Sequence, residues 1–213
     1  MFWNTVTPLL KNILLNLMSS EIFDPFRLVG GTSLSLQIGH RISVDIDLFT
    51  DAAYDSLDFT QIDEYFRKNY HYVSTNAGLT LAPGHSWYVG ASQSDAVKID
   101  LYYTEPFIRR VVEKEKVRFA SVEDIIAMKL EVIARGGRKK DFWDLHALYE
   151  KYPIANMIDL HHERYPYSYS ATELRNAFVN FLNAEEDFEP VCLFGKHWPL
   201  IKLDFVQWIS DAK

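Results

Sequence analysis

Two aspartates that lie two residues apart, Asp45 and Asp47, are the first residues whose types and spacing suggest chemistry. They fall in a stretch that alternates between apolar and polar side chains, which predicts a half-buried strand over residues 43–49. Because side chains alternate along a strand, both carboxylates point to the same face, with Cβ atoms roughly 6.5–7 Å apart. Magnesium is usually held by one or two carboxylates together with substrate phosphates. The alternative is an edge strand with two solvated acids, and an isolated Asp-x-Asp pair favours that alternative.

A Gly-Gly turn precedes this strand, in the sequence Gly30-Gly31-Thr32-Ser33 at a strand-to-helix junction. Glycine lets a backbone approach a ligand closely, and a helix start offers N–H groups and a positive dipole end to a phosphate. His40-Arg41 stands directly before the strand, and Arg41 could also meet a phosphate. A plain turn and a surface loop are the alternatives for these two features.

A third aspartate, Asp100, lies on a predicted strand over residues 96–103. Val97, Ile99 and Leu101 alternate with it and form the apolar face, so Asp100 lies on the polar face. If this strand pairs beside the strand over residues 43–49, three carboxylates converge.

Lys129 lies within an apolar stripe of a predicted helix, four residues after Ile125 and four before Ile133. A buried ammonium without a partner is costly. Either its stem reaches the surface, or the stripe faces a cleft and the ammonium meets a phosphate. Asp141 could orient Lys129, or could simply occupy a first helical turn, where acids are favoured. Asp144 points away from the stripe and is expected to lie at the surface.

These residues need elements that position them, and hydrophobic periodicity predicts an α/β part followed by a helical part. Helices are expected over residues 6–19, 33–38, 58–69, 121–135, 139–150, 154–164, 171–183 and 201–211. Strands are expected over residues 27–29, 43–49, 71–75, 86–92 and 96–103, separated in part by Asn76 and Gly78. The alternation over residues 43–49 places Val44, Ile46 and Leu48 on the buried face, and residues 184–200 are expected to be irregular. The predicted domains are residues 1–118 and 119–213.

Composition sets the broader limits. The chain has 213 residues, is 48% hydrophobic and carries a net charge of −7, which argues against non-specific binding of nucleic acid. Residues 105–140 nevertheless hold 10 Lys or Arg against 6 Asp or Glu. One cysteine, Cys192, excludes an intrachain disulfide, and the absence of a long apolar run or a basic leader predicts a cytoplasmic protein without a membrane segment.

The sequence LVGGTSL from Leu28 to Leu34, followed by HRISVDIDLF from His40 to Phe49, resembles the AbiEii/AbiGii-type nucleotidyltransferases. These are toxin components of type IV toxin–antitoxin systems within the polymerase-β-like nucleotidyltransferase superfamily. The glycine motif followed by the aspartate motif is far more specific to this family than either motif alone. A later stretch, from Ser121 to Leu148, is also similar to the family, with a helical lysine and then Arg-x-x-Lys-Asp-x-x-Asp-Leu, here Arg135 to Leu145 with extra spacing.

The resemblance implies an α+β fold, with the mixed sheet of a nucleotidyltransferase flanked by helices and a C-terminal helical bundle. It implies that Gly30, Gly31, Thr32 and Ser33 hold the triphosphate of an NTP, with Arg41 and Lys129 as further phosphate ligands. It also implies that Asp45 and Asp47 bind Mg²⁺ with Asp100 as the third carboxylate, which activates an acceptor hydroxyl. Lys129 and Asp141 match the family's later catalytic positions.

The expected activity is magnesium-dependent transfer of a nucleoside monophosphate to tRNA or another cellular acceptor. The basic segment 105–140 is the candidate RNA-facing surface, and a separate antitoxin protein is a possible partner. Three alternatives stay open: a nucleotidyltransferase acting on a small molecule or protein, a degenerate nucleotide-binding protein, and a structural helical module.

Overall fold

The computed structural model describes residues 1–75 and 83–211. The helices and helical turns are η1 (Trp3–Thr5), α1 (Pro8–Met18), η2 (Glu21–Phe23), α2 (Gly30–Ile38), α3 (Phe59–Asn69), α4 (Val122–Ala134), α5 (Lys139–His146), α6 (Ile154–Arg164), α7 (Ala171–Ala177), α8 (Leu182–Glu185) and α9 (Trp198–Asp211). The strands are β1 (Arg27–Leu28), β2 (Asp45–Thr50), β3 (Tyr72–Thr75), β4 (Gly84–Ser92), β5 (Asp95–Tyr103), β6 (Val112–Lys114) and β7 (Val117–Phe119).

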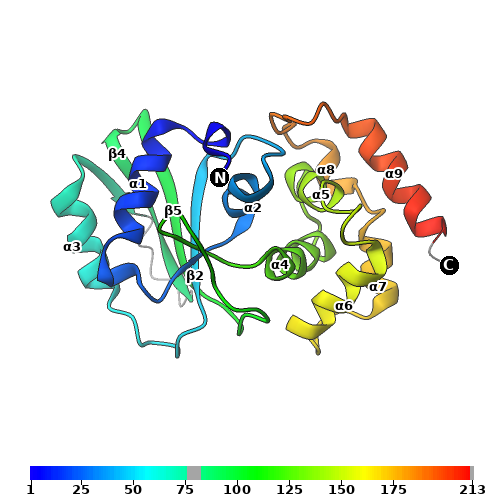
Figure 1. Ribbon diagram of the computed structural model, residues 1–213, viewed down its shortest axis with the longest axis horizontal. Helices are drawn as coiled ribbons and strands as arrows, with labels where there is room; N and C mark the ends of the chain where they lie inside the picture. Colours follow the sequence, from blue (N-terminus) through cyan, green and yellow to red (C-terminus); the bar gives the residue numbers. More distant parts are fainter. Residues whose placement is uncertain (76–82, 212–213) are drawn as a thin grey trace.

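The strands form one mixed sheet in the order β3-β4-β5-β2-β1-β7-β6. Strand β2 runs parallel to β5, and β1 runs parallel to β7, while the other neighbours are antiparallel. The helices α4 to α9 follow the sheet as a separate lobe (Figure 1). This arrangement confirms the predicted α+β fold class.

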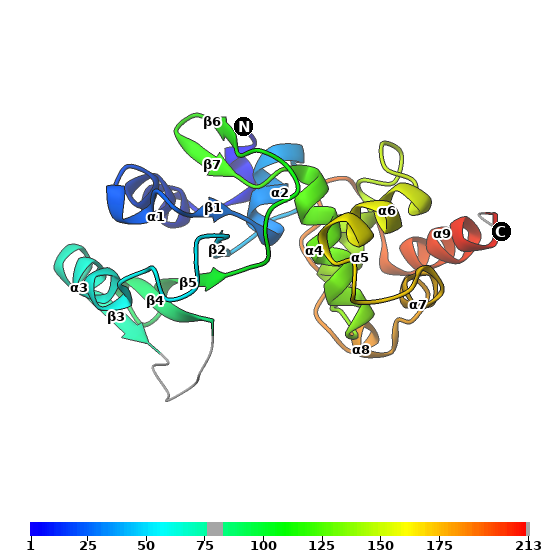
Figure 2. The ribbon, with the colours of Figure 1, turned by 90° about the horizontal axis from the view of Figure 1, so that it is seen from below.

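One face of the sheet is covered by α1 and α3, which lie on the same side of it (Figure 2). Helix α1 begins at Pro8 after Thr7, whose side chain accepts a hydrogen bond from the Leu10 backbone N–H at 3.1 Å. Asp58 caps α3 in the same way. The apolar faces of both helices pack on the alternate buried residues of β2, β4 and β5, which builds the core of the sheet lobe.

A second core joins α4 to the other C-terminal helices. Helix α2 lies between the two cores, because Leu36 belongs to the sheet core while Leu34 belongs to the helical core. The core membership changes between Phe119 and Ala120. The division into domains at residues 118 and 119 stays a prediction. None of the helices in the described part of the chain is long and apolar enough to span a bilayer.

Several boundaries differ from the predictions. Helix α2 begins at Gly30 rather than Ser33, so the Gly-Gly pair forms its first turn. Strands β6 and β7 were not predicted, since each has three residues and forms a hairpin too short for a periodic signal. The predicted helix over residues 171–183 is interrupted after Ala177, and α9 begins at Trp198 inside the segment expected to be irregular. The predicted separators Asn76 and Gly78 lie outside the described residues.

Candidate active site

The three aspartates found by sequence come together on β2 and β5. The parallel register of these strands sets Asp47 directly beside Asp100 and sets Asp45 beside Lys98. The Lys98 ammonium donates a hydrogen bond to Asp100 Oδ2 at 2.6 Å, and the Lys140 ammonium lies 3.8 Å from Asp45 Oδ2. The strand pairing that the sequence could only suppose is therefore present, and two lysines from different elements partly balance three carboxylates.

Asp47, in the middle of this group, has a raised pKa. Burial, followed by the negative charges of Asp100 and Asp45, raises the pKa of Asp47 to about 6. A divalent cation between the carboxylates would relieve this repulsion. Within residues 1–75 and 83–211, no three His, Cys, Asp or Glu side chains are already arranged to hold a metal ion. Asp45 and Asp47 nevertheless fit Mg²⁺, which completes its shell with substrate phosphates and water rather than an all-protein cage.

The Gly-Gly turn faces the same carboxylates. Val29 N–H donates to the Asp47 backbone oxygen at 2.8 Å, which ties the start of α2 to β2. Gly30 and Gly31 line the cleft, whereas Thr32 and Ser33 are buried. The Thr32 hydroxyl donates to the Asp45 backbone oxygen. In this arrangement Thr32 fixes the strand that carries the aspartates, and a phosphate role for Thr32 and Ser33 stays a prediction.

A cleft with a cavity volume of about 180 Å³ lies between the start of α2, β2 and helices α4 and α5. Charged side chains line it, namely Asp45, Asp47, Lys129 and Lys140. Apolar side chains line it as well, namely Val29, Phe49, Ile125, Met128 and Val132. A cleft lined by carboxylates, ammonium groups and apolar side chains suits a molecule that joins phosphates to a flat, less polar group.

Lys129 does not reach the surface, so the alternative of a snorkelling side chain is wrong. Its side chain is 9% exposed, and its ammonium donates to Asp141 Oδ1 at 2.6 Å and contacts Asp144 Oδ2 at 2.7 Å. Burial alone would lower the pKa of Lys129, but the charges of Asp141 and Asp144 raise it above the usual value. Lys129 therefore stays protonated at the cleft wall, and Asp141 orients it.

Asp144 is fully buried, so the prediction of a surface position is wrong. It accepts two hydrogen bonds from the Arg41 guanidinium, at 2.6 and 2.9 Å, and one from His40 Nε2 at 2.7 Å. Burial alone would raise the pKa of Asp144, but the charges of Arg41 and Lys129 hold it well below its usual 3.8. Because burial lowers the pKa of His40, that ring is neutral at pH 7 and donates.

Arg41 is thus a partner of Asp144 in this structure, and its predicted role as a phosphate ligand stays a prediction. The ion pair joins the residues that lead into β2 with helix α5, over 103 positions of sequence. No local pattern marks such a pair. Two residues of the basic segment 105–140, Arg138 and Lys140, line the cleft.

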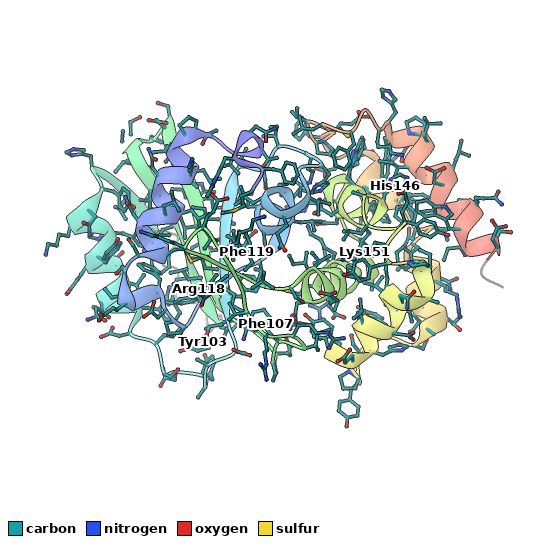
Figure 3. All side chains as sticks on the ribbon, in the orientation of Figure 1. Tyr103, Phe107, Arg118, Phe119, His146 and Lys151 are labelled. Atoms are coloured by element: carbon teal, nitrogen blue, oxygen red, sulfur yellow. The ribbon has the colours of Figure 1, made fainter. Side chains whose placement is uncertain are left out.

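The basic segment 105–140 does not form one surface. Arg118 donates to the backbone oxygens of Met18, Phe23 and Phe26 inside the sheet lobe (Figure 3). Arg109 pairs with Glu163 at 2.5 Å, and Arg135 pairs with Glu131. Part of the local positive charge is therefore paired within the chain, and an RNA-facing surface along this segment stays a prediction.

Gly30 provides a test of how closely the α2 turn must approach the carboxylates. Its φ of +68° is a left-handed conformation, and a Cβ added there would overlap Asp47 Oδ2. We expect Gly30→Ala to lower the free energy of unfolding by about 1–2 kcal/mol and to weaken nucleotide binding, because Asp47 must move. Gly195→Ala is the matched control, with a φ of +65° and nothing within 4 Å of the added Cβ. Equal nucleotide affinity in both variants, measured by titration, would contradict a close contact at Gly30.

Comparison with known proteins agrees with this geometry. A proposed nucleotidyltransferase from H. pylori has the same fold, with a TM-score of 0.62 at 20% identity over 94% of this chain and 90% of that one. The nucleotidyltransferase toxin MenT4 from Mycobacterium tuberculosis H37Rv gives a TM-score of 0.52 at 12% identity over 93% and 80% of the two chains. An uncharacterized protein of Aquifex aeolicus is 31% identical over 148 residues, which span 67% of this chain and 66% of the relative.

The mixed sheet with paired aspartates beside a glycine turn defines a nucleotidyltransferase. The family described as nucleotidyl transferase AbiEii toxin, type IV TA system, matches residues 12–192, and the chain belongs to this family. The resemblance noted in the sequence is thereby confirmed.

Proposed function

We propose that this protein transfers a nucleoside monophosphate from an NTP to a cellular acceptor in a magnesium-dependent reaction, as the toxin of a type IV toxin–antitoxin pair. The observation that carries the proposal is the pairing of Asp47 with Asp100 on neighbouring strands, beside a cleft that Asp45, Asp47, Gly30 and Gly31 line. Family membership supports the toxin role. A tRNA or another cellular RNA is the proposed acceptor, a separate antitoxin chain is the proposed regulator, and the cytoplasm is the proposed site of action.

Asp45 and Asp47 are the residues that would hold Mg²⁺. When bound there, the metal neutralises charge that develops on the triphosphate during transfer. Asp100 stands beside Asp47 and would accept or position the proton of the attacking hydroxyl. Its Oδ2 already accepts a hydrogen bond from Lys98, which leaves Oδ1 for that proton.

Lys129, Lys140 and Arg138 would steady the phosphates. Burial, followed by the positive charges of Arg138 and Lys129, lowers the pKa of Lys140, so a bound phosphate would stabilise its charged form. Apolar side chains that line the cleft, such as Met128 and Val132, would contact the nucleoside. Most of the rate enhancement would then come from positioning and electrostatics.

The direct test is to incubate the protein with each labelled NTP, Mg²⁺ and total cellular RNA, beside an Asp45→Ala/Asp47→Ala control. Label that enters RNA with the wild type alone is the expected result, and it identifies the nucleotide. Label that enters protein or a small molecule instead would keep the transferase activity and change the acceptor. If the wild-type protein shows neither transfer nor magnesium-dependent NTP binding, the proposal is overturned.

A further inference from the structure

The face of the sheet that carries Asp100 also carries tyrosines on β4 and β5. Side chains alternate along these strands, and Trp87, Val89 and Ile99 point to the opposite face, into the core under α1 and α3. Tyr88 and Tyr102 therefore lie on the face of the carboxylates. Tyr88 is 39% exposed, which is high for a large side chain on a strand inside a sheet.

The strand register orders this face into rows that run outward from the aspartates. One row is Asp47, Asp100 and Ser86, on β2, β5 and β4. The next row toward one end is Asp45, Lys98, Tyr88 and Ser74, and it continues onto β3. The row toward the other end contains Phe49 and Tyr102. The two tyrosines thus flank the Asp100 row on both sides.

Distances across the sheet fit a chain of nucleotides. Neighbouring strands lie about 4.8 Å apart, so Tyr88 on β4 stands roughly 5 Å beyond the strand of Asp100 and roughly 10 Å beyond the strand of Asp45 and Asp47. That separation corresponds to one or two stacked nucleotides. The Tyr102 hydroxyl is hydrogen-bonded with Ser86 Oγ at 3.1 Å, which fixes the ring beside the Asp100 row.

Asp100 itself has a carboxylate oxygen without a hydrogen-bond partner among the described residues. This oxygen, Oδ1, is buried, while Lys98 holds Oδ2. A buried carboxylate oxygen without a donor is costly, so a ligand hydroxyl that donates to it would be stabilised. An approaching acceptor supplies such a hydroxyl.

The charge of the chain favours recognition by stacking. The net charge of −7 gives little general attraction for a phosphate backbone, and Arg109, Arg118 and Arg135 of the basic segment already pair within the chain. Aromatic side chains on an open sheet face bind unstacked bases with little sequence preference, and they need few cations. On this face Lys98 supplies a positive charge, while Ser74 and Ser86 supply hydroxyls.

We propose that the face of β4 and β5 formed by Tyr88, Tyr102, Ser86 and Lys98 binds the single-stranded end of a nucleic-acid acceptor. The terminal hydroxyl meets Asp100, and the bases next to it stack on the tyrosines. This acceptor subsite rests on the proposed nucleotidyl transfer. It also differs from the cleft between α2, α4 and α5, which takes the NTP.

The test uses Tyr88→Ala and Tyr88→Phe with a short single-stranded oligoribonucleotide as acceptor. We expect Tyr88→Ala to raise the KM for the oligonucleotide by about 10-fold, because one stacking contact is lost. Tyr88→Phe keeps the ring and should retain the wild-type KM. Both variants should bind NTP with unchanged affinity, since Tyr88 does not line the cleft. Tyr167→Ala is the matched control, because Tyr167 is 99% exposed on the helical lobe.

A binding measurement separates this subsite from the activity. An oligoribonucleotide containing 4-thiouridine, irradiated with the wild-type protein, should cross-link to the peptide that contains Tyr88. Transfer to RNA with an unchanged KM in Tyr88→Ala, or transfer to protein or a small molecule alone, would overturn the subsite while the transferase function stands. A cross-link at Tyr88 without any transfer would support binding of single-stranded RNA to this face, but it would overturn the transferase function and the role of the face as an acceptor subsite. Absence of both would overturn both.

Discussion

Asp144→Asn is expected to lower the free energy of unfolding by about 3–5 kcal/mol, the range found when one member of a buried ion pair is removed. Asp144 is fully buried and accepts hydrogen bonds from Arg41 and His40 while it contacts the Lys129 ammonium. Lys129 would keep Asp141 as a partner, but the Arg41 guanidinium would lose its carboxylate in a site with 3% exposure. The melting temperature should fall by about 10 °C, as expected for a chain of this size.

The same substitution should also reduce transfer, because Asp144 fixes two parts of the cleft. It holds Arg41, close to the start of β2, and it contacts Lys129 on the cleft wall. Urea unfolding followed by circular dichroism measures the stability, and the rate per folded molecule separates activity from folding.

A histidine–aspartate contact elsewhere provides the control. His146 Nε2 lies 2.7 Å from Asp204 Oδ2, but the Asp204 side chain is 45% exposed. Water screens an exposed pair, so Asp204→Asn should cost at most about 1 kcal/mol. Similar losses of stability in Asp144→Asn and Asp204→Asn would show that the buried Asp144 cluster contributes no more to the free energy of unfolding than an exposed pair does.

The contrast between Asp144 and Asp100 explains how far the sequence could predict the site. Asp100 lies in a clean apolar alternation, so its face could be predicted, and the register then placed it beside Asp47. Asp144 lies on α5, an eight-residue helix that is buried on almost every side. Five of its eight residues are polar and four of these are buried, so polarity in the sequence does not show which side chains face solvent. Its partners Arg41 and His40 are more than 100 residues away in sequence, so only the fold brings them together.

Strand boundaries show the same limit. Ile46 and Leu48 are buried as the alternation predicts, but Val44 is 58% exposed because β2 begins at Asp45. The residues before it are held by other segments: Ser43 N–H donates to the Thr5 oxygen, and Ile42 N–H donates to the Val191 oxygen. Alternation in a sequence shows which side chains share a face, but it does not show where ladder pairing ends.

Asp47→Asn should have opposite effects on activity and on stability. Transfer should fall by about 10³-fold or more, since one carboxylate of the proposed magnesium site is lost and a metal ion contributes several kcal/mol to such reactions. Stability should rise at neutral pH. Burial and the neighbouring charges of Asp100 and Asp45 raise the pKa of Asp47 from 3.8 to about 6, so its ionised form is disfavoured in the folded protein. The free energy of unfolding of the wild type therefore falls as pH rises from about 4 through about 6.

Asparagine does not ionise, so the variant should escape this loss. A pKa shift of roughly two units corresponds to about 3 kcal/mol, and partial exposure of Asp47 reduces the expected gain to about 1–2 kcal/mol above pH 6. Melting curves at pH 4 and pH 8 measure it: the two proteins should be equally stable at pH 4 and differ at pH 8. Mg²⁺ should raise the melting temperature of the wild type at pH 8 and have little effect on Asp47→Asn, because binding to the folded state stabilises it by mass action. Equal stabilities of the two proteins at pH 8 would mean that the carboxylates do not repel one another in the folded protein, and the electrostatic argument for a cation between Asp45, Asp47 and Asp100 would then fail.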